Sequence, residues 1–402
     1  MRATVATFVE DFMHEGPSVV AANIAHRAGA TGVSIAAAYH DARDVFPHDP
    51  LHRVRFAEAG TVLFHPDPEL YRGLRVQPRL AQVARDRDAF RDCCAAARDE
   101  GLDVTAWTVF LHTDRGAELA ELAPENAFGD RYLTDLCPAR PEVHDFAVAL
   151  ATDVAGTGAS VVDAESLHHA PFRHGYHHER NFVPIGEAAA FLLSLCFCAA
   201  CAQLAEERGV DAARVRAEVR HQLDAWMAGA AEPPLRRAAI GELAGGELAG
   251  YLAARADAVT ALVADVSDAV QERGARLNFC DLSGALKGYT DGAATGETAA
   301  ETSWTLGVDL PRIAATGARI GALGYAADAE RLRADLDDYA RLLPGRSWAL
   351  TLRPMLPDTP SAAALRQKVQ VAAEFPVEEL SFYHYGMAPL EALDWIRTAL
   401  GR

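Results

Sequence analysis

The stretch PEVHDFAVALATDVAGTGASVVDAE, residues 141–165, contains one complete helix-to-strand unit. Its first part, residues 141–156, carries Ala and Val at helical spacing and predicts a helix. Its last part, residues 159–164, is a short apolar run typical of a buried strand, and acidic residues stand at its end. A helix that leads into a buried strand is the repeating unit of proteins with a parallel sheet.

Seven more units of this kind occur in the chain, some before this stretch and some after it. The predicted strands cover residues 4–9, 32–38, 103–111, 159–164, 275–280, 319–324, 347–353 and 379–383. No Gly-rich phosphate loop follows the first strand, which counts against a doubly wound open sheet. Eight units without a linker predict a single α/β domain over residues 1–402, a (β/α)8 TIM barrel. A helical insertion, residues 187–273, is expected after the fourth strand and carries most of a cysteine cluster.

The net charge of the chain counts against some classes of binding partner. Acidic residues number 56 and basic residues 38, which gives a net charge of −18. An acidic surface repels phosphate backbones and anionic lipids, so we expect no nucleic-acid and no membrane partner. The N-terminal apolar stretch is broken by Glu10 and Asp11, and no window approaches the ~20 apolar residues of a membrane span. We therefore expect a cytoplasmic protein that acts on a small molecule.

The chain has seven cysteines, three of which form C-x-C-x-x-C in SLCFCAAC, residues 194–201. An odd number with such clustering favours reduced thiols and a metal over disulfides. Cys196, Cys198 and Cys201 can bind one tetrahedral Zn²⁺, and Cys137 in DLCPARPEV is the expected fourth ligand of a closed, structural site. The alternative is that these thiols are small buried hydrophobic side chains. Core packing is the expected role of Cys93, Cys94 and Cys280.

This order of Cys137, a helix, a strand ending at Glu165 and then C-x-C-x-x-C resembles the family 42 glycoside hydrolases of β-galactosidase type, over roughly residues 100–210. The resemblance implies a TIM barrel, a zinc ion on the four cysteines, Glu165 as acid/base and a homo-oligomer. The chain departs from the family pattern at Ala164, where the family has Asn. It also lacks the family's nucleophilic Glu in the seventh strand, WALTLRPM.

The carboxyl ends of barrel strands carry the chemistry of such enzymes, and here they are rich in titratable and aromatic residues. Cleaving a glycosidic bond requires one carboxylic acid and a second carboxylate that acts as nucleophile or base. Glu165 is the expected general acid, because burial at the barrel mouth would raise its pKa. Asp281 is the expected carboxylate opposite it, and Asp163 a close partner that tunes it. The expected substrate-contacting residues are Glu10, Tyr39, His40, Trp107, His112, Arg173, His174, Tyr325, Arg353 and His384.

A histidine-rich segment follows the fourth strand. Its histidines are His168, His169, His174, His177 and His178. We interpret it first as a wall that donates hydrogen bonds to a sugar, second as a solvated loop, and third as a metal site, since HHAPFRHGYHH has no standard metal signature. The Gly-rich segment 283–298 is expected to form a mobile lid.

Three functions remain open at this point. The leading hypothesis is a glycosidase or glycosidase-like enzyme that acts on a small carbohydrate. The second is a barrel lyase or isomerase with histidine-assisted proton transfer. The third is a degenerate barrel that binds carbohydrate without catalysis. Two carboxylates that face each other across the mouth favour the first, His and Arg around one carboxylate favour the second, and a capped mouth favours the third.

Overall fold

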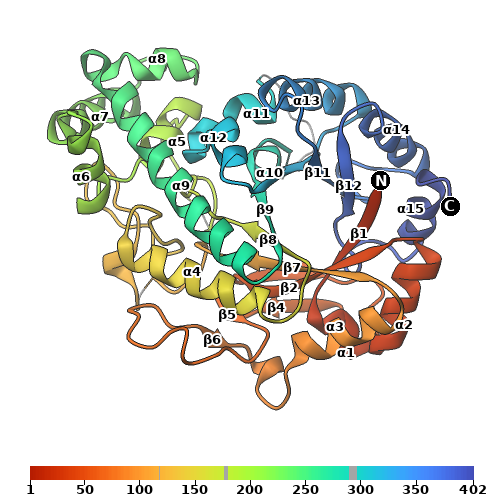
Figure 1. The fold of residues 1–402 in the computed structure, drawn as a ribbon. Helices are drawn as coiled ribbons and strands as arrows, with labels where there is room; N and C mark the ends of the chain where they lie inside the picture. Colours follow the sequence, from red (N-terminus) through yellow and green to blue (C-terminus); the bar gives the residue numbers. More distant parts are fainter. Residues whose placement is uncertain (117, 176–179, 289–296) are drawn as a thin grey trace.

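The computed structural model describes residues 1–116, 118–175, 180–288 and 297–402. Within these residues, eight parallel strands surround a common axis (Figure 1). They are β1 (Arg2–Thr7), β2 (Gly32–Tyr39), β7 (Asp103–Val109), β8 (Val161–Glu165), β9 (Arg276–Asp281), β10 (Arg319–Leu323), β11 (Trp348–Leu352) and β12 (Val377–Phe382). Because β1 pairs with both β2 and β12, the sheet closes on itself. The predicted (β/α)8 barrel is confirmed.

Helices cover the outside of the barrel and bury their apolar sides against the strands (Figure 1). They are α1 (Val9–Glu15), α2 (Pro17–Ala22), α3 (Ala89–Asp99), α4 (Pro141–Ala155), α11 (Ala299–Thr302), α12 (Leu310–Ala315), α13 (Ala329–Leu342), α14 (Ala362–Ala372) and α15 (Ala392–Ala399). The short helix α10 (Ser283–Gly288) lies instead at the carboxyl ends of β9 and β10, where Ala285 shares a small apolar cluster with Cys280 and Leu323. Local sequence explains several of the helix starts. The side chains of Asp88 and Asp328 accept backbone N–H groups at the beginning of α3 and α13, and Pro141 opens α4.

The helical insertion after β8 is also confirmed, at the upper left of Figure 1. It comprises α5 (Glu187–Ser194), α6 (Ala199–Glu207), α7 (Ala212–Met227), α8 (Arg237–Gly241) and α9 (Glu247–Glu272). These helices share a second hydrophobic core, to which Leu192, Val215 and Tyr251 belong. The long helix α9 runs from this core to the barrel, where it packs on α4.

No single helix among the described residues is long and apolar enough to cross a membrane. The helices α5 and α6, bent at 96° to each other, pass the same test of length and composition only as a pair.

The connection from β2 to α3 contains structure that the sequence does not predict. A hairpin of β3 (Ala42–Val45) and β4 (Val54–Ala57) is followed by β5 (Thr61–Val62), antiparallel to β2, and β6 (Arg79–Leu80). Arg55 of the hairpin forms an ion pair of 3.2 Å with Glu10 and lies 3.9 Å from the ring centroid of Phe8. The hairpin therefore covers the polar residues that follow β1.

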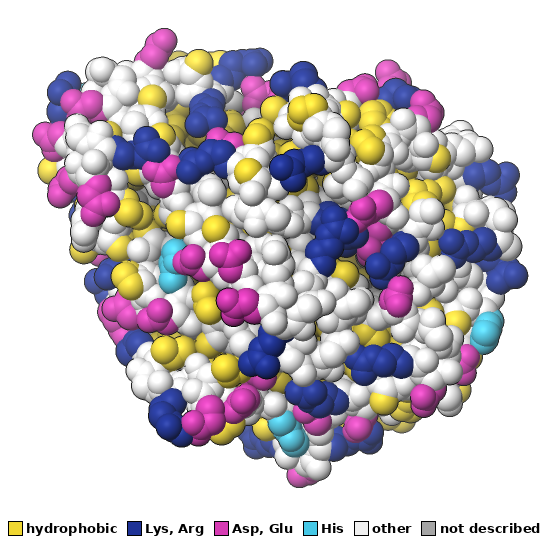
Figure 2. Space-filling view, viewed as in Figure 1, with side chains coloured by type: hydrophobic (Ala, Val, Ile, Leu, Met, Phe, Trp, Pro, Cys, Tyr) yellow, Lys and Arg dark blue, Asp and Glu magenta, His cyan; other side chains and the backbone are white. Residues whose placement is uncertain are grey.

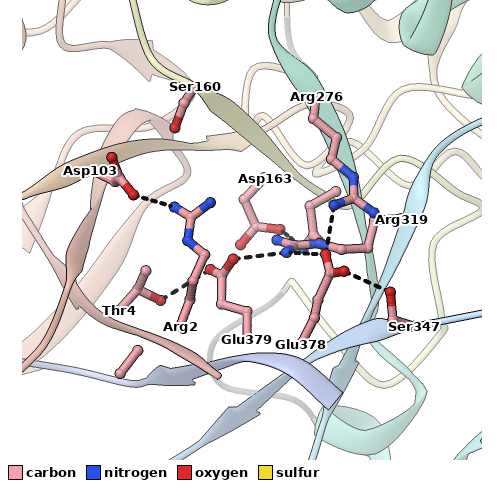
Figure 3. A network of polar contacts seen from close by, with 12 residues as sticks. Arg2, Thr4, Asp103, Ser160, Asp163, Arg276, Arg319, Ser347, Glu378 and Glu379 are labelled. Atoms are coloured by element: carbon pink, nitrogen blue, oxygen red, sulfur yellow. Dashed lines mark hydrogen bonds and ion pairs between the residues drawn. The ribbon is translucent and has the colours of Figure 1, made fainter. Parts of the chain in front are cut away.

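The interior of the barrel is polar near the amino ends of its strands (Figure 3). Arg319 on β10 is buried and donates to Glu379 Oε2 at 2.8 Å and to Asn278 Oδ1 at 2.7 Å. Asn278 in turn donates its amide to Asp163 Oδ1 at 2.5 Å. A Cβ atom at Gly321 would lie 2.5 Å from this amide, so glycine leaves the space that Asn278 occupies. Through Asn278, these residues at the floor of the barrel fix the position of the Asp163 side chain.

The excess of acidic residues does not form one large acidic field on the face seen in Figure 1. Figure 2 shows acidic and basic side chains interspersed over this face. Charged side chains of the described residues form many ion pairs that are at least partly exposed, such as Arg276 with Glu378 at 2.6 Å. Such pairs contribute little to stability but keep the surface polar.

Candidate active site

A cavity of about 700 Å³ opens at the carboxyl ends of the strands. Barrel enzymes bind their substrates at this end. Residues expected from the sequence supply much of its lining: Tyr39, His40, Trp107, Asp163, Glu165, Arg173, His174, Tyr325 and Arg353. Polar groups that converge on a single cavity of this size are typical of a site for a small molecule.

Glu165 is the last residue of β8, and its carboxyl group lies at the cavity wall. The indole Nε1 of Trp107, on the neighbouring strand β7, donates to Glu165 Oε2 at 2.5 Å. Burial raises the pKa of Glu165 from 4.5 to about 7, against the opposing effect of this hydrogen bond. The carboxyl group is therefore able to hold and release a proton near neutral pH.

Asp163 lies two residues earlier on β8, so its side chain points to the same side of the strand. Burial raises its pKa from 3.8 to about 6, while the amide of Asn278 and the charge of Arg319 lower it. The negative charge of Asp163 also helps to raise the pKa of Glu165. The two carboxyl groups are thus coupled, and their environments give Glu165 the higher pKa.

Histidines form another wall of the cavity. The rings of His40 and His174 line it, and both are near the ring of His112, at centroid distances of 4.7 and 5.0 Å. His112 Nδ1 lies 3.2 Å from Asp135 Oδ1. Burial disfavours a charged ring at His112, but the carboxylates of Asp135, Asp114 and Glu165 outweigh burial and raise its pKa to about 9. Burial and the neighbouring His112 lower the pKa of His40 to about 3.

Arg353 and Tyr325 form a part of the lining that comes from β10 and β11. The guanidinium carbon of Arg353 lies 4.1 Å from the ring centroid of Tyr325, a cation–π contact. Asp358 anchors Arg353, accepting from Nε at 2.7 Å, and the ammonium of Lys368 lies 3.7 Å from the same carboxyl group. The contact with Asp358 thus fixes the guanidinium of Arg353, a planar hydrogen-bond donor, next to the aromatic face of Tyr325 at the cavity.

Asp281 does not line the cavity, contrary to its expected place opposite Glu165. Asn278 and Cys280 point into the barrel, so the alternation along β9 turns Asp281 outward, toward α13. There it accepts hydrogen bonds from Tyr339 Oη at 2.6 Å and from Ser283 Oγ at 2.6 Å. The sequence places Asp281 at the barrel mouth because the predicted strand ends at residue 280, but the side of β9 that each residue faces decides which one enters the cavity.

We therefore expect Asp281→Asn to weaken folding and to spare catalysis. An amide can accept through only one oxygen, so one of the donors to Asp281 would lose its acceptor, at a cost of about 1–3 kcal/mol. Denaturant unfolding and kcat/KM, measured on the same preparation, check this. Tyr339→Phe is the matched control, because it removes one donor and leaves Asp281 in place. A large fall in kcat/KM without loss of stability would contradict the assignment.

Three other expected contact residues lie outside the cavity lining. Glu10, on α1, is paired with Arg55. His384 is fully buried, with its ring centroid 4.2 Å from that of Phe8 and its Nε2 atom 3.9 Å from Asp11. His112 is buried behind His40 and His174.

The histidine-rich segment is only partly described. His168 lines the cavity, and His169 is buried next to it. His177 and His178 lie outside the described residues, as do residues 289–296, half of the expected lid.

Some cavity residues are not among those expected from the sequence. Asp135, Thr351, Met355, Ser381 and Tyr383 all line it. The last two follow from alternation along β12, since Glu379 points inward and Ser381 and Tyr383 stand two and four residues later. Asp135 lies in a long loop after β7, and no pattern in the sequence predicts its contact with His112.

The four cysteines of the expected metal site come together away from the cavity. Cys137 Sγ lies 3.5 Å from Cys201 Sγ and 3.7 Å from the sulfurs of Cys196 and Cys198. A zinc ion with Zn–S bonds of about 2.3 Å separates its tetrahedral sulfurs by about 3.8 Å, whereas a disulfide needs about 2.05 Å. The backbone N–H of Glu125 donates to Cys196 Sγ at 3.3 Å. The geometry and the donor set fit one tetrahedral metal ion.

No family model matches the chain, and no curated protein matches it. Solved structures do match. Their shared feature is the TIM barrel, and the neighbours described here are glycoside hydrolases. The PgaB (BpsB) glycoside hydrolase domain from Bordetella bronchiseptica has a TM-score of 0.55 at 14% identity, over 100% of this chain and 97% of that domain.

Two further enzymes match the barrel. The catalytic domain of beta-amylase from Paenibacillus polymyxa has a TM-score of 0.53 at 10% identity, over 98% of this chain and 94% of that domain. Beta-galactosidase from Marinomonas ef1 has a TM-score of 0.55 at 11% identity, and the chain spans only 59% of that enzyme. At these identities the likeness concerns the fold, and the resemblance to family 42 stays a prediction.

Proposed function

We propose that the protein cleaves a glycosidic bond in a small carbohydrate and that Glu165 donates the proton to the leaving oxygen. The observation that carries the proposal is the environment of Glu165, a buried carboxyl group at the cavity whose pKa is raised to about 7. Trp107 occupies Oε2, which leaves Oε1 to carry the proton. A neutral carboxylic acid next to the substrate is the first requirement for glycoside cleavage.

The second carboxylate in this proposal is Asp163, in place of Asp281. Among the described residues that line the cavity, the other carboxylates are Asp135 and Asp163, and Asp135 is engaged with His112. Asn278 holds Asp163 in place, and the ionised form would stabilise the positive charge that develops on the sugar ring. Arg173, Arg353 and His174 would bind sugar hydroxyl groups, and Tyr39 and Tyr325 would contact sugar faces.

This proposal predicts a narrow pH optimum. Glu165 must be protonated, so activity should fall as the pH rises through about 7; Asp163 must be ionised, so activity should fall as the pH drops through about 6. Because the two groups are coupled, the two apparent pKa values of the kcat/KM profile describe the pair of carboxyl groups and not each residue separately. Asn278→Ala removes a hydrogen bond that lowers the pKa of Asp163 and should move the acidic limb upward. A profile without limbs between pH 5 and 8 would contradict these roles.

A panel of oligosaccharides and aryl glycosides tests the reaction class. Release of reducing ends that depends on Glu165 supports glycoside cleavage. A barrel lyase or isomerase is the second candidate, favoured by the histidines and arginines that surround one carboxyl pair. Products with a new double bond or a rearranged sugar would identify it. Binding of a sugar without any turnover would indicate a non-catalytic barrel.

We also propose that the cysteine cluster holds a structural Zn²⁺ ion. Four thiolates around Zn²⁺ carry a net charge of −2, and the charges of Arg140 and Arg255 both act on the cluster. All four cysteines are buried, and none lines the cavity, so a bound ion would stabilise the insertion and take no part in catalysis. Cytoplasmic location and homo-oligomerisation remain predictions from the sequence.

A further inference from the structure

The histidine wall contains a second group of possible metal ligands. His40 follows β2, and His112 and Asp114 follow β7, so the pairing of β2 with β7 brings them together. One ring nitrogen of each histidine and one carboxylate oxygen of Asp114 all lie within 4.8 Å of one another. Within the described part of the chain, the other such group is the cysteine cluster.

In both histidines the ring nitrogen Nδ1 already faces an oxygen atom of the protein, so the other nitrogen, Nε2, is available. His112 Nδ1 faces Asp135 Oδ1 at 3.2 Å, and His40 Nδ1 faces the carbonyl oxygen of Asp41 at 2.5 Å. A carboxylate or carbonyl on one ring nitrogen is the arrangement that orients the histidines of metal sites. Nε2 of each ring is therefore the nitrogen left to bind a ligand.

Asp114 is held in place to complete the group. Its carboxylate accepts the backbone N–H of Asp41 at 3.0 Å, and its backbone has φ 52°, the left-handed conformation that only a few residue types adopt readily. Asp114 Oδ2 lies 3.6 Å from His112 Nε2, too far for a good hydrogen bond. Two ligand atoms about 2.1 Å from one ion are about 3.0–3.4 Å apart at octahedral or tetrahedral angles. A shift of a few tenths of an ångström brings this pair to that separation, and the ligand atom of His40 lies within 4.8 Å of both.

We propose that His40, His112 and Asp114 bind one divalent transition-metal ion at the edge of the cavity. Two imidazoles and one carboxylate suit Zn²⁺, Co²⁺ or Fe²⁺ better than Ca²⁺ or Mg²⁺. Three protein ligands leave open coordination positions, and His40 lies in the cavity lining, so these positions face the bound substrate. The ligand would be a pair of sugar hydroxyl groups. That last assignment rests on the proposed function, whereas metal binding itself does not.

The experiment is a titration of the metal-depleted full chain with Co²⁺, followed by absorption. We expect about two ions per chain, one with the intense sulfur charge-transfer bands of a thiolate site and one with only weak visible bands. His112→Gln and Asp114→Asn should each lose the second ion and keep the first, which shows that the chain is folded. Asp135→Asn should lower the affinity for the second ion by about 10–100-fold, because Asp135 orients His112. His26→Ala, which removes an exposed histidine in the helical segment before β2, is the control and should bind both ions.

The proposal fails if the wild-type chain shows the thiolate bands and binds no further Co²⁺. It also fails if His112→Gln and Asp114→Asn both keep a second ion of unchanged affinity. Either result leaves the role of Glu165 intact, since that role is measured by glycoside turnover. Conversely, if the protein cleaves no glycoside at all, the second Co²⁺ ion should still bind.

Discussion

Replacing Glu165 with Gln should lower kcat/KM by about 10²–10⁴-fold on substrates with poor leaving groups. Gln keeps the shape of Glu and the hydrogen bond from Trp107, but it has no acidic proton for the leaving oxygen. Aryl glycosides with acidic phenols need little protonation, so their cleavage should be affected far less. A plot of log kcat/KM against the pKa of the leaving group should be steep for Glu165→Gln and shallow for the wild type.

Asp163→Asn is the matched comparison for this result. It removes the charge that would stabilise the developing cation, so it should harm substrates with good and poor leaving groups alike. Equal activity of Glu165→Gln and wild type on a cleaved oligosaccharide would end the assignment of Glu165 as general acid. A loss that is the same on every substrate would instead indicate that Glu165 has another role.

The stability of Glu165→Gln separates a catalytic carboxyl group from a structural one. The folded-state pKa of Glu165, about 7, is above the ordinary value of 4.5, so the folded protein holds this proton more tightly than the unfolded chain. That contribution is complete below pH 4.5 and is lost as the pH rises through about 7. The ionised carboxylate then costs the folded state up to about 3 kcal/mol. Glu165→Gln should therefore be more stable than the wild type at pH 8, and this advantage should vanish at pH 4.

The position of Glu165 could be predicted from the sequence because it depends on one short strand. An apolar run that ends on a carboxylate puts that carboxylate at the barrel mouth, and two-residue alternation adds Asp163. The same rule, applied to β9, shows where the prediction for Asp281 was wrong. Cys280 and Asp281 are neighbours and must face opposite sides, so only one of them can enter the cavity. Fixing which one requires the register of β9 against β8, which the sequence of β9 alone does not contain.

The histidine wall could be predicted only in part, for a different physical reason. His40 stands directly after β2 and His112 three residues after β7, so their place at the carboxyl end of the barrel could be predicted, but not that His112 lies behind His40. Asp135 stands 23 positions after His112 in the sequence and reaches it through tertiary packing. The polar floor of the barrel could not be predicted either, because the sequence does not show that Arg319 and Glu379, near the amino ends of β10 and β12, face each other inside the barrel. Their mutual ion pair permits this burial.

Removal of the metal from the cysteine cluster should produce the largest loss of stability. Zinc at a thousand times its dissociation constant stabilises the folded state by about 4 kcal/mol. Cys137→Ser removes the sulfur that contacts the other three, and it should abolish that contribution. The checks are zinc content, the unfolding midpoint with and without chelator, and limited proteolysis. The unfolding of residues 187–272 should come first, since the cysteines belong to their core.

Cys94→Ser is the control, because Cys94 is a buried cysteine in the barrel core and not part of the cluster. It should cost packing energy and leave zinc content and chelator sensitivity unchanged. Loss of zinc should also affect the cavity in one specific way. Arg173 donates to the carbonyl oxygen of Ile185 at 2.5 Å, and Ile185 packs on the insertion core just before α5. Loosening that core frees Arg173, so KM should rise while kcat, which depends on Glu165, is retained. Equal KM values for zinc-loaded and zinc-free protein would show that the insertion and the cavity are uncoupled.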